Sequence, residues 1–170
     1  LLFTDTDIGY FDSRARLTPV LRQQRDRDAL SAALADGTID ALVSDHTPVD
    51  DDAKALPFAE AEAGATGLEL LLSVALKWSH DAGVPLARAL GVITHEPARV
   101  LGSALGTLQA SIGRIVEGGV GDLCVVAPED YWTVAPHALA SQGKHTPLSG
   151  YELPARVRAT LVGGHIAFER

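Results

Sequence analysis

The sequence predicts an α/β fold in which helices occupy the chain to about residue 110 and strands with turns follow. Two observations favour this class. First, a helical segment, a glycine turn and a short apolar strand follow one another at residues 26–44, and together they make half of a βαβ unit. Second, from residue 113 onwards short apolar runs alternate with glycine-rich turns. The hydrophobic content of 46% suits a globular domain and is too high for a disordered chain.

The first third of the chain supplies the clearest helix and strand signals. Residues 1–25 are predicted to be rich in loops, because Asp, Gly and Pro interrupt them. Residues 26–35 place their apolar side chains on one helical face, and Gly37 suits the left-handed residue that follows a helix. The apolar run at residues 39–44 then fits a buried parallel strand.

A long polar loop is expected at residues 50–66, beginning with three carboxylates that we interpret as solvated. Residues 67–80 predict a helix that is too apolar all round to lie on the surface. Two shorter helices are expected after it, one at residues 85–93 with Pro85 in its first turn and one at residues 96–101 with Thr94 as its N-cap.

The last third of the chain is predicted to form two hairpins. Residues 114–117 and 122–127 fit strands around the turn Gly118–Gly121, which is a weak match to a phosphate loop and lacks the following Lys and Ser or Thr. Residues 158–162 are expected to pair with residues 166–168 across a Gly-Gly turn.

Composition excludes several classes of protein. The net charge of −8 and the absence of any basic run argue against nucleic-acid binding, and no apolar stretch reaches the ~20 residues that span a membrane. Without a signal-peptide pattern, a cytoplasmic location is expected. The single cysteine, Cys124, excludes an internal disulfide and a cysteine-based zinc cluster, and its apolar neighbours predict a buried small side chain rather than a reactive thiol. The start at Leu1, with no methionine anywhere, suggests a fragment of a longer polypeptide, although an engineered start has the same appearance.

Asp45 is the leading candidate for chemistry. An acidic residue at the C-terminal end of a parallel strand points into the mouth of an α/β barrel, where a carboxylate binds a divalent metal or moves a proton. The alternative is that Asp45 only caps the next turn. His46 faces the other way and suits a supporting role, and the other five histidines, which show no metal-ligand spacing, are expected to be structural or superficial: His80, His95, His137, His145 and His165.

Several motifs run through the chain in a recognisable order. Leu17–Arg22 is similar to the segment NPPLR, Asp36–Asp40 with Ser44–Pro48 to DGTID…TDHAPH, Gly64–Glu69 to GxxGLE, and Gly143–Leu153 to GKNTPFxGWEL. Gly113–Ile115 with Gly121–Leu123 adds the less specific GxI…GxxADLV. Together these motifs resemble dihydroorotases, which are metal-dependent amidohydrolases, and the last of the four main motifs distinguishes them from hydantoinases and allantoinases.

The resemblance implies a (β/α)8 TIM barrel beside a small β-sandwich. Residues 1–110 would be the C-terminal part of the barrel, and residues 111–170 a portion of the sandwich. It also implies a zinc site of one or two ions, most of whose ligands lie upstream of this chain, with Asp45 as metal ligand and proton carrier. The implied reaction interconverts dihydroorotate and N-carbamoyl-L-aspartate in pyrimidine biosynthesis, and a homo-oligomer is expected.

The resemblance places four substrate contacts at Thr18, Val49, Ala63 and Gly64, of which the last two act through their backbone. Two of the four depart from the family pattern. Val49 replaces the histidine that grips the substrate carboxylate, and Thr18 replaces an asparagine. Two hypotheses therefore stay open: a catalytic dihydroorotase, favoured by Asp45, or a non-catalytic subunit that acts as scaffold for aspartate transcarbamoylase, favoured by Val49 and Thr18.

Overall fold

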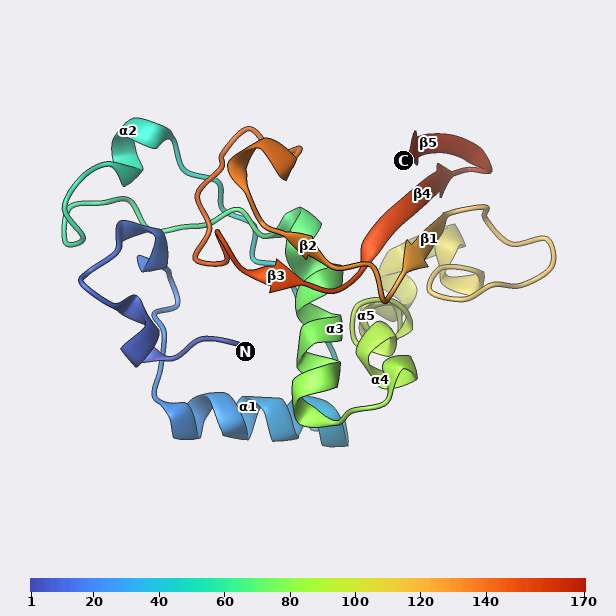
Figure 1. Ribbon diagram of the computed structural model, residues 1–170. Helices are drawn as coiled ribbons and strands as arrows, with labels where there is room; N and C mark the ends of the chain where they lie inside the picture. The colour runs from blue at the N-terminus through green and yellow to red at the C-terminus, as the bar shows by residue number, and fades with distance from the viewer.

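The computed structural model describes residues 1–170 and places the α-helices before the strands (Figure 1). The helices are α1 (Gln24–Asp36), α2 (Asp51–Lys54), α3 (Leu71–Ala82), α4 (Leu86–Gly91) and α5 (His95–Leu101), and the 3-10 helices are η1 (Asp5–Ile8), η2 (Ser13–Ala15), η3 (Leu68–Leu70), η4 (Gly102–Ala110) and η5 (Pro136–Ala138). The strands are β1 (Leu123–Ala127), β2 (Trp132–Thr133), β3 (Glu152–Leu153), β4 (Arg156–Val162) and β5 (His165–Glu169). None of the helices combines the length and the apolar character that crossing a membrane requires.

The predicted helices are confirmed, with small shifts at their ends. α1 begins two residues earlier than expected and ends at Asp36, just before Gly37, whose φ of 90° is the left-handed conformation that glycine adopts without a steric penalty. η3 and α3 together cover the predicted apolar helix. Thr94 precedes α5 but does not cap it, because its hydroxyl donates to the carbonyl of Leu90 in the preceding turn at 2.6 Å instead.

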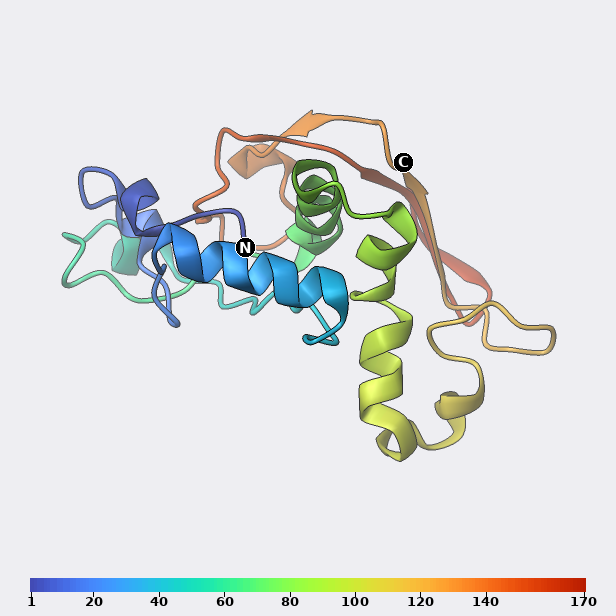
Figure 2. The ribbon, with the colours of Figure 1, turned by 90° about the horizontal axis from the view of Figure 1, so that it is seen from below.

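α3 lies between two apolar clusters and joins them. On one side Trp78 packs with α1 and α4, and its indole N–H donates to the Ser31 hydroxyl at 2.8 Å. On the other side the start of α3 packs against the β2–β3 region, and Ser73 donates to the carbonyl of Ala155 at 3.1 Å. α1 crosses the C-terminal end of α3 at a large angle (Figure 1), and α4 and α5 lead away from α3 (Figure 2). The clusters contain Leu34, Trp78, Ala89 and Val92, and Leu70, Val134, Leu139, Leu148 and Leu153.

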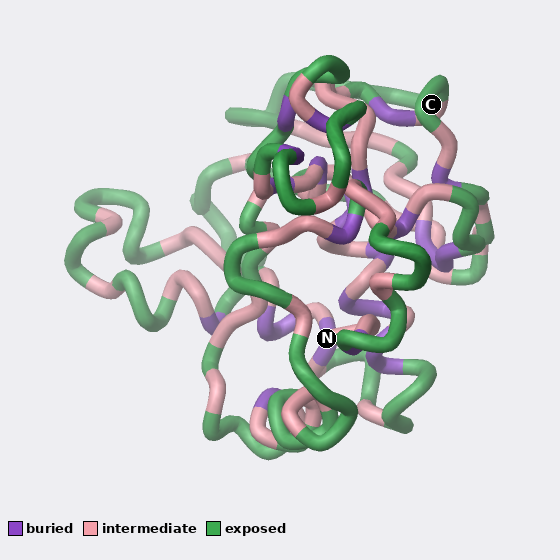
Figure 3. Tube along the Cα trace, turned by 90° about the vertical axis from the view of Figure 1, so that its left-hand side faces the viewer, coloured by how far each residue is buried: buried purple, intermediate pink, exposed green.

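The strands form two small antiparallel sheets, one in the order β1-β4-β5 and one of β2 and β3. The predicted hairpin of β4 and β5 across Gly163 and Gly164 is confirmed, with Val162 opposite His165. Buried residues occur in short stretches separated by exposed ones (Figure 3), and only 25 of the 170 residues are buried. The core that holds the site in place is therefore small.

The predicted parallel strand at residues 39–44 is not formed. The chain is extended there, but only the N–H of Leu42 bonds across, to the carbonyl of Val92 at 2.9 Å. A parallel strand needs a parallel neighbour to share its ladder, and every strand pair in this chain is antiparallel. Val43 consequently keeps 72% of its surface exposed.

The hairpin predicted before β1 is also wrong. Residues 114–117 form no strand, because the groups just before β1 bond elsewhere: Gly121 accepts the N–H of Gly164 at 2.9 Å and Asp122 accepts that of Gly163 at 2.7 Å. Cys124 was expected to be buried and is exposed, since no second layer covers this face of β1.

The polar stretch at residues 50–66 is not wholly a loop. α2 forms one helical turn directly after Asp50, and the three carboxylates at residues 50–52 are exposed, as the solvated interpretation expects. Residues 55–66 continue without regular structure but are tied back by backbone hydrogen bonds, including Glu62 N–H to the Ala53 carbonyl at 3.1 Å.

Candidate functional site

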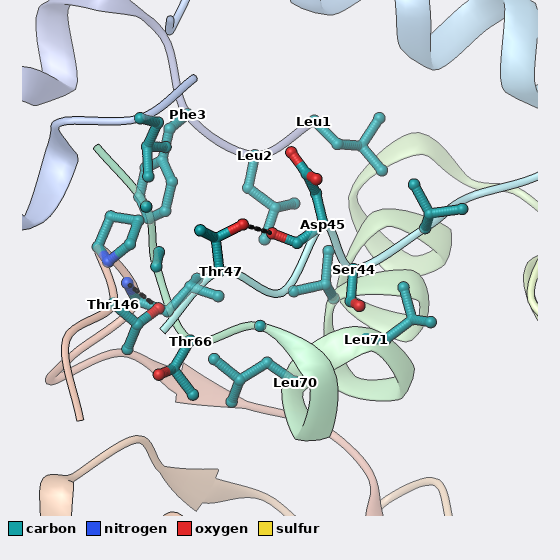
Figure 4. Close-up of a pocket in the computed structure, with 18 of the residues that line it drawn as sticks. Leu1, Leu2, Phe3, Ser44, Asp45, Thr47, Thr66, Leu70, Leu71 and Thr146 are labelled. Atoms are coloured by element: carbon teal, nitrogen blue, oxygen red, sulfur yellow. Dashed lines mark hydrogen bonds between the residues drawn. The ribbon is translucent and has the colours of Figure 1, made fainter. Parts of the chain in front are cut away.

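A cavity of about 240 Å³ lies where the N-terminal segment, the extended stretch before α2, the start of α3 and the 146–148 segment meet (Figure 4). Twelve of its 22 lining residues are hydrophobic, which gives a mostly apolar wall with a few polar groups, as ligand sites generally have. The polar side chains among the lining residues are Thr18, Ser44, Asp45, Thr47, Thr66 and Thr146.

Asp45 is the only charged side chain in this lining. Its backbone has a φ of 46°, a left-handed conformation that costs a residue other than glycine of the order of 1–3 kcal/mol. The carboxylate is exposed and has no hydrogen-bond or ion-pair partner in this chain, whereas the backbone carbonyl accepts from the Thr47 hydroxyl at 3.3 Å. The turn-cap alternative for Asp45 therefore has no side-chain hydrogen bond to support it.

His46 supports the stretch that carries Asp45. Its Nδ1 accepts the N–H groups of Gly67 at 3.1 Å and Leu68 at 3.2 Å, which are unpaired donors at the start of η3. Because Nδ1 accepts both bonds, the proton of the neutral ring lies on Nε2. His46 thus has the structural role that the sequence predicts. It joins the stretch that carries Asp45 to the start of η3 behind the cavity.

Two glycines allow the backbone of residues 64–67 to approach the Asp45 stretch. A Cβ on Gly67 would lie 2.7 Å from the Ser44 carbonyl oxygen, and a Cβ on Gly64, whose φ is 148°, would lie 2.5 Å from the Thr47 carbonyl oxygen. Any side chain at either position would force the two stretches apart. The close approach is completed by a hydrogen bond from the Thr47 N–H to the Ala65 carbonyl at 3.0 Å.

The structure brings together three of the five predicted site residues. Asp45, Thr18 and Gly64 line the same cavity. Ala63 is half-buried outside the lining. Val49 is 4% exposed and also lies outside it, with its Cγ2 atom only 2.8 Å from where a Cβ on Gly64 would stand. In this conformation Val49 supports the wall behind Gly64 and does not face the cavity.

Sequence reasoning missed two buried threonines of the cavity wall. Thr66 is 1% exposed, and its hydroxyl donates to the Gly143 carbonyl at 2.5 Å while its N–H donates to the His145 carbonyl at 2.8 Å. Thr146, also 1% exposed, accepts the Leu148 N–H at 3.3 Å. The motif at residues 143–153 marked this segment, but nothing local shows that it folds back onto residue 66.

Glu69 fixes the other end of the same segment. Its carboxylate accepts the N–H groups of Ala140 at 2.7 Å and Ser141 at 3.0 Å. Burial alone would raise the pKa of this carboxyl, but the bonds from Ala140 and Ser141 and the charge of Lys144 outweigh it and hold the pKa below its ordinary 4.5. Near the cavity, His145 Nε2 also lies 2.8 Å from an Asp51 carboxylate oxygen.

No three or more His, Cys, Asp or Glu side chains in this chain gather closely enough to hold a metal ion. The cavity lining contains one carboxylate and no histidine, cysteine, lysine or arginine. These residues do not fit a complete zinc site, which takes about three protein ligands in an enzyme. On its own the cavity offers one proton acceptor, several hydroxyls and an apolar wall.

Comparison with known proteins agrees with the motifs. No protein-family model matches the sequence. A dihydroorotase of Geobacter metallireducens is 36% identical over 167 residues, 98% of this chain and 38% of that protein. A dihydroorotase-like protein of Pseudomonas aeruginosa is 37% identical over 169 residues, 99% of this chain and 38% of that protein. The chain thus spans little more than a third of the length of these relatives.

Solved structures show the same correspondence in three dimensions. A D-hydantoinase superposes with a TM-score of 0.85 and 21% identity over 99% of this chain and 37% of its own. The L-hydantoinase of Arthrobacter aurescens gives a TM-score of 0.80 and 23% identity over 98% of this chain and 37% of its own. The fold of this chain is therefore that of a portion of these hydrolases.

Proposed function

We propose that this chain, which is a C-terminal portion of an amidohydrolase related to dihydroorotases, forms one wall of an active site that hydrolyses a cyclic amide. The observation that carries the proposal is Asp45, an unpaired carboxylate held in a left-handed conformation at the cavity and lying within the family's Asp-His-x-Pro motif. Strained backbone of this kind is concentrated at functional sites.

The proposed reaction is the interconversion of dihydroorotate and N-carbamoyl-L-aspartate. In the hydrolytic direction a water oxygen bonds to the carbonyl carbon of the ring amide, the C–N bond breaks, and one water proton moves to the departing nitrogen. Asp45 carries that proton: its carboxylate accepts it from the attacking water and returns it to the nitrogen. Because Asp45 has no partner within the chain, its oxygens are free for this exchange.

For the complete protein we propose zinc, which supplies Lewis-acid polarisation of the amide carbonyl when bound. Asp45 is the one ligand that we propose from this chain. Because the chain spans 38% of its Geobacter relative, we propose that the remaining ligands lie in the rest of the complete protein. We therefore expect the isolated 170-residue chain to be inactive.

The architecture proposed for the complete protein is a (β/α)8 barrel with a small β-sandwich. Residues 1–110 contribute to the barrel and residues 111–170 to the sandwich. The stretch at residues 39–44, which joins no sheet in this chain, supports this arrangement, because Asp45 follows it at the cavity and the stretch would become a barrel strand beside parallel neighbours.

Thr18 and Gly64 are the proposed substrate contacts, through a hydroxyl and a backbone group at the cavity. Val49 can supply no charge to the substrate carboxylate. Loss of one charge-assisted contact costs roughly 1.5–3 kcal/mol, or about one to two decades of affinity. We expect a KM for dihydroorotate that is higher by about that factor than in relatives with histidine at this position.

The test is dihydroorotase activity of the full-length protein with added zinc. Asp45→Asn keeps the size of the side chain but removes the proton acceptor, and we expect it to lower kcat by about 100-fold or more. Glu129→Gln is the matched control, because Glu129 is exposed and has no hydrogen-bond partner. Equal activity in Asp45→Asn and in the parent would defeat the assignment of Asp45. A parent protein that folds but is inactive would contradict the catalytic hypothesis. It would favour the alternative of a scaffold for aspartate transcarbamoylase.

A further inference from the structure

A buried lysine ties α2 to the N-terminal segment. Lys54, in α2, is 2% exposed, which is rare for a cation, because a buried charge is costly unless hydrogen bonds satisfy it. Its Nζ donates to the carbonyls of Ser13 at 3.1 Å and Arg16 at 3.0 Å. In return the Ser13 hydroxyl donates to the Lys54 carbonyl at 2.6 Å.

The same contact region continues to the cavity. The Arg16 carbonyl that accepts from Lys54 also accepts the N–H of Gly64 at 3.0 Å, and the Arg16 guanidinium donates to the Ala61 carbonyl at 3.0 Å. One carbonyl oxygen therefore links the buried ammonium to a residue of the cavity wall. Leu17 and Thr18 follow Arg16 directly and line the cavity from the other side. Figures 1 and 2 show α2 beside the segment that contains η1 and η2, away from the N-terminus itself.

No carboxylate contacts the Lys54 ammonium. Burial, and then the charge of Arg16, lower the pKa of Lys54, while Glu62 and Asp12 oppose them from a distance. A long apolar side chain would fill the same space without the cost of burying a charge. The Lys54 ammonium holds two carbonyl groups at a fixed position. Methionine or leucine has no donor with which to do so.

We propose that Lys54 is a positioning residue, which fixes Thr18 and Gly64 at the cavity wall by holding the Arg16 carbonyl between them. Residues 13–18 and 54–64 form one unit through this contact, so the polar stretch after α2 is not an independent lid. The kinetic consequence rests on the proposed function, whereas the structural consequence does not.

The first test is hydrogen exchange on the full-length protein carrying Lys54→Met. This variant keeps the length of the side chain and removes the donors, so we expect the amides of residues 60–66 to exchange about tenfold faster or more, the size expected for losing charge-assisted hydrogen bonds. Amides of α3 should not change. Lys77→Met is the matched control, because Lys77 is on the exposed side of α3 and pairs only with Asp81. Unchanged exchange at residues 60–66 would overturn the proposal.

The second test separates positioning from a general loss of structure. Asp45 is intact in Lys54→Met, so KM for dihydroorotate should rise about tenfold while kcat changes less than about twofold. A fall in kcat with an unchanged KM contradicts the proposal.

Ser13→Ala is the second variant, for use where Lys54→Met does not fold, because it removes one hydrogen bond and leaves no buried charge unpaired. It should shift the exchange rate and KM in the same direction by about threefold. If neither the exchange rate nor KM shifts, the proposal is overturned. If the parent has no activity, the proposed function fails, but the exchange measurement still decides the role of Lys54.

Discussion

Asp45 combines a strained backbone with a carboxylate that has no partner in the chain. Its φ of 46° lies in the region where a side chain crowds the backbone, yet the carboxylate gains no hydrogen bond in return. The surrounding contacts enforce the conformation: His46 holds residues 67 and 68, and Gly64 allows the Thr47 backbone to approach. Neighbouring bonds thus offset the strain, and the carboxylate is left free for the role proposed above.

Substituting Asp45 by glycine should therefore stabilise the protein and abolish its activity. Glycine adopts this φ without strain, so we expect Asp45→Gly to raise the free energy of unfolding by about 0.5–1 kcal/mol, whereas Asp45→Ala lowers it. The measurement is urea unfolding of each variant. Asp52→Gly, the same substitution within α2, is the control and should destabilise by up to about 1 kcal/mol. If Asp45→Gly destabilises as much as Asp52→Gly, the strain assigned to Asp45 is wrong.

Among the elements, the sequence predicts those that depend on nearby residues and misses those that depend on distant ones. α1 and the β4–β5 hairpin depend on periodicity and on glycines within a few residues, so both are predicted correctly. The stretch at residues 39–44 has strand-like residues but belongs to neither sheet, because no strand of this chain lies parallel beside it. The exposure of Cys124 likewise depends on what covers the sheet.

The candidate site divides in the same way. The motifs predict Asp45 and Gly64 as site residues, and the structure places both in the cavity lining. For Gly64 the reason is steric, because a Cβ there would lie 2.5 Å from the Thr47 carbonyl oxygen. The contacts of Thr66 with Gly143 and of Lys54 with Arg16 join residues 77 and 38 positions apart, and no local pattern encodes them. Val49 was predicted as a substrate contact by alignment to a motif, but its side chain is buried behind Gly64.

At the scale of elements, Glu69 should make stability depend on acid. The folded pKa of Glu69 lies below the ordinary 4.5, so the unfolded carboxyl takes up a proton at a higher pH than the folded one. The stabilisation is complete above about pH 4.5 and is lost as the pH falls through the folded value.

We therefore expect Glu69→Gln to lower the free energy of unfolding by about 1–2 kcal/mol at about pH 7, because an amide accepts the Ala140 and Ser141 N–H groups more weakly. The deficit should shrink at about pH 3, where the carboxyl is itself increasingly protonated. Urea unfolding at both pH values gives the comparison, with Glu129→Gln as control. A deficit of equal size at both pH values would mean that the charge of Glu69 is not what fixes residues 140 and 141.

At the scale of the whole molecule, the small core leaves large apolar side chains in water. Ile166 is 63% exposed and Val125 50% exposed on the β1-β4-β5 sheet, and Val43 is 72% exposed on the unpaired stretch. Leu123 and Ile166 both stand opposite Leu161, so they share one face of the sheet. Contiguous apolar surface and unpaired strand edges promote association in a chain that leaves them uncovered.

We expect the isolated 170-residue chain to self-associate for this reason, and Ile166→Lys to reduce the association by placing a charge on this apolar face, on the edge strand β5. Light scattering over a range of concentrations measures the average mass of each. Val20→Lys is the control, because Val20 is similarly exposed, at 55%, but lies outside the sheet. A monodisperse monomer at all concentrations contradicts the expectation outright. If Ile166→Lys and Val20→Lys have equal effects, the chains do not associate through the sheet. The unpaired stretch around Val43 is then the surface through which two copies meet.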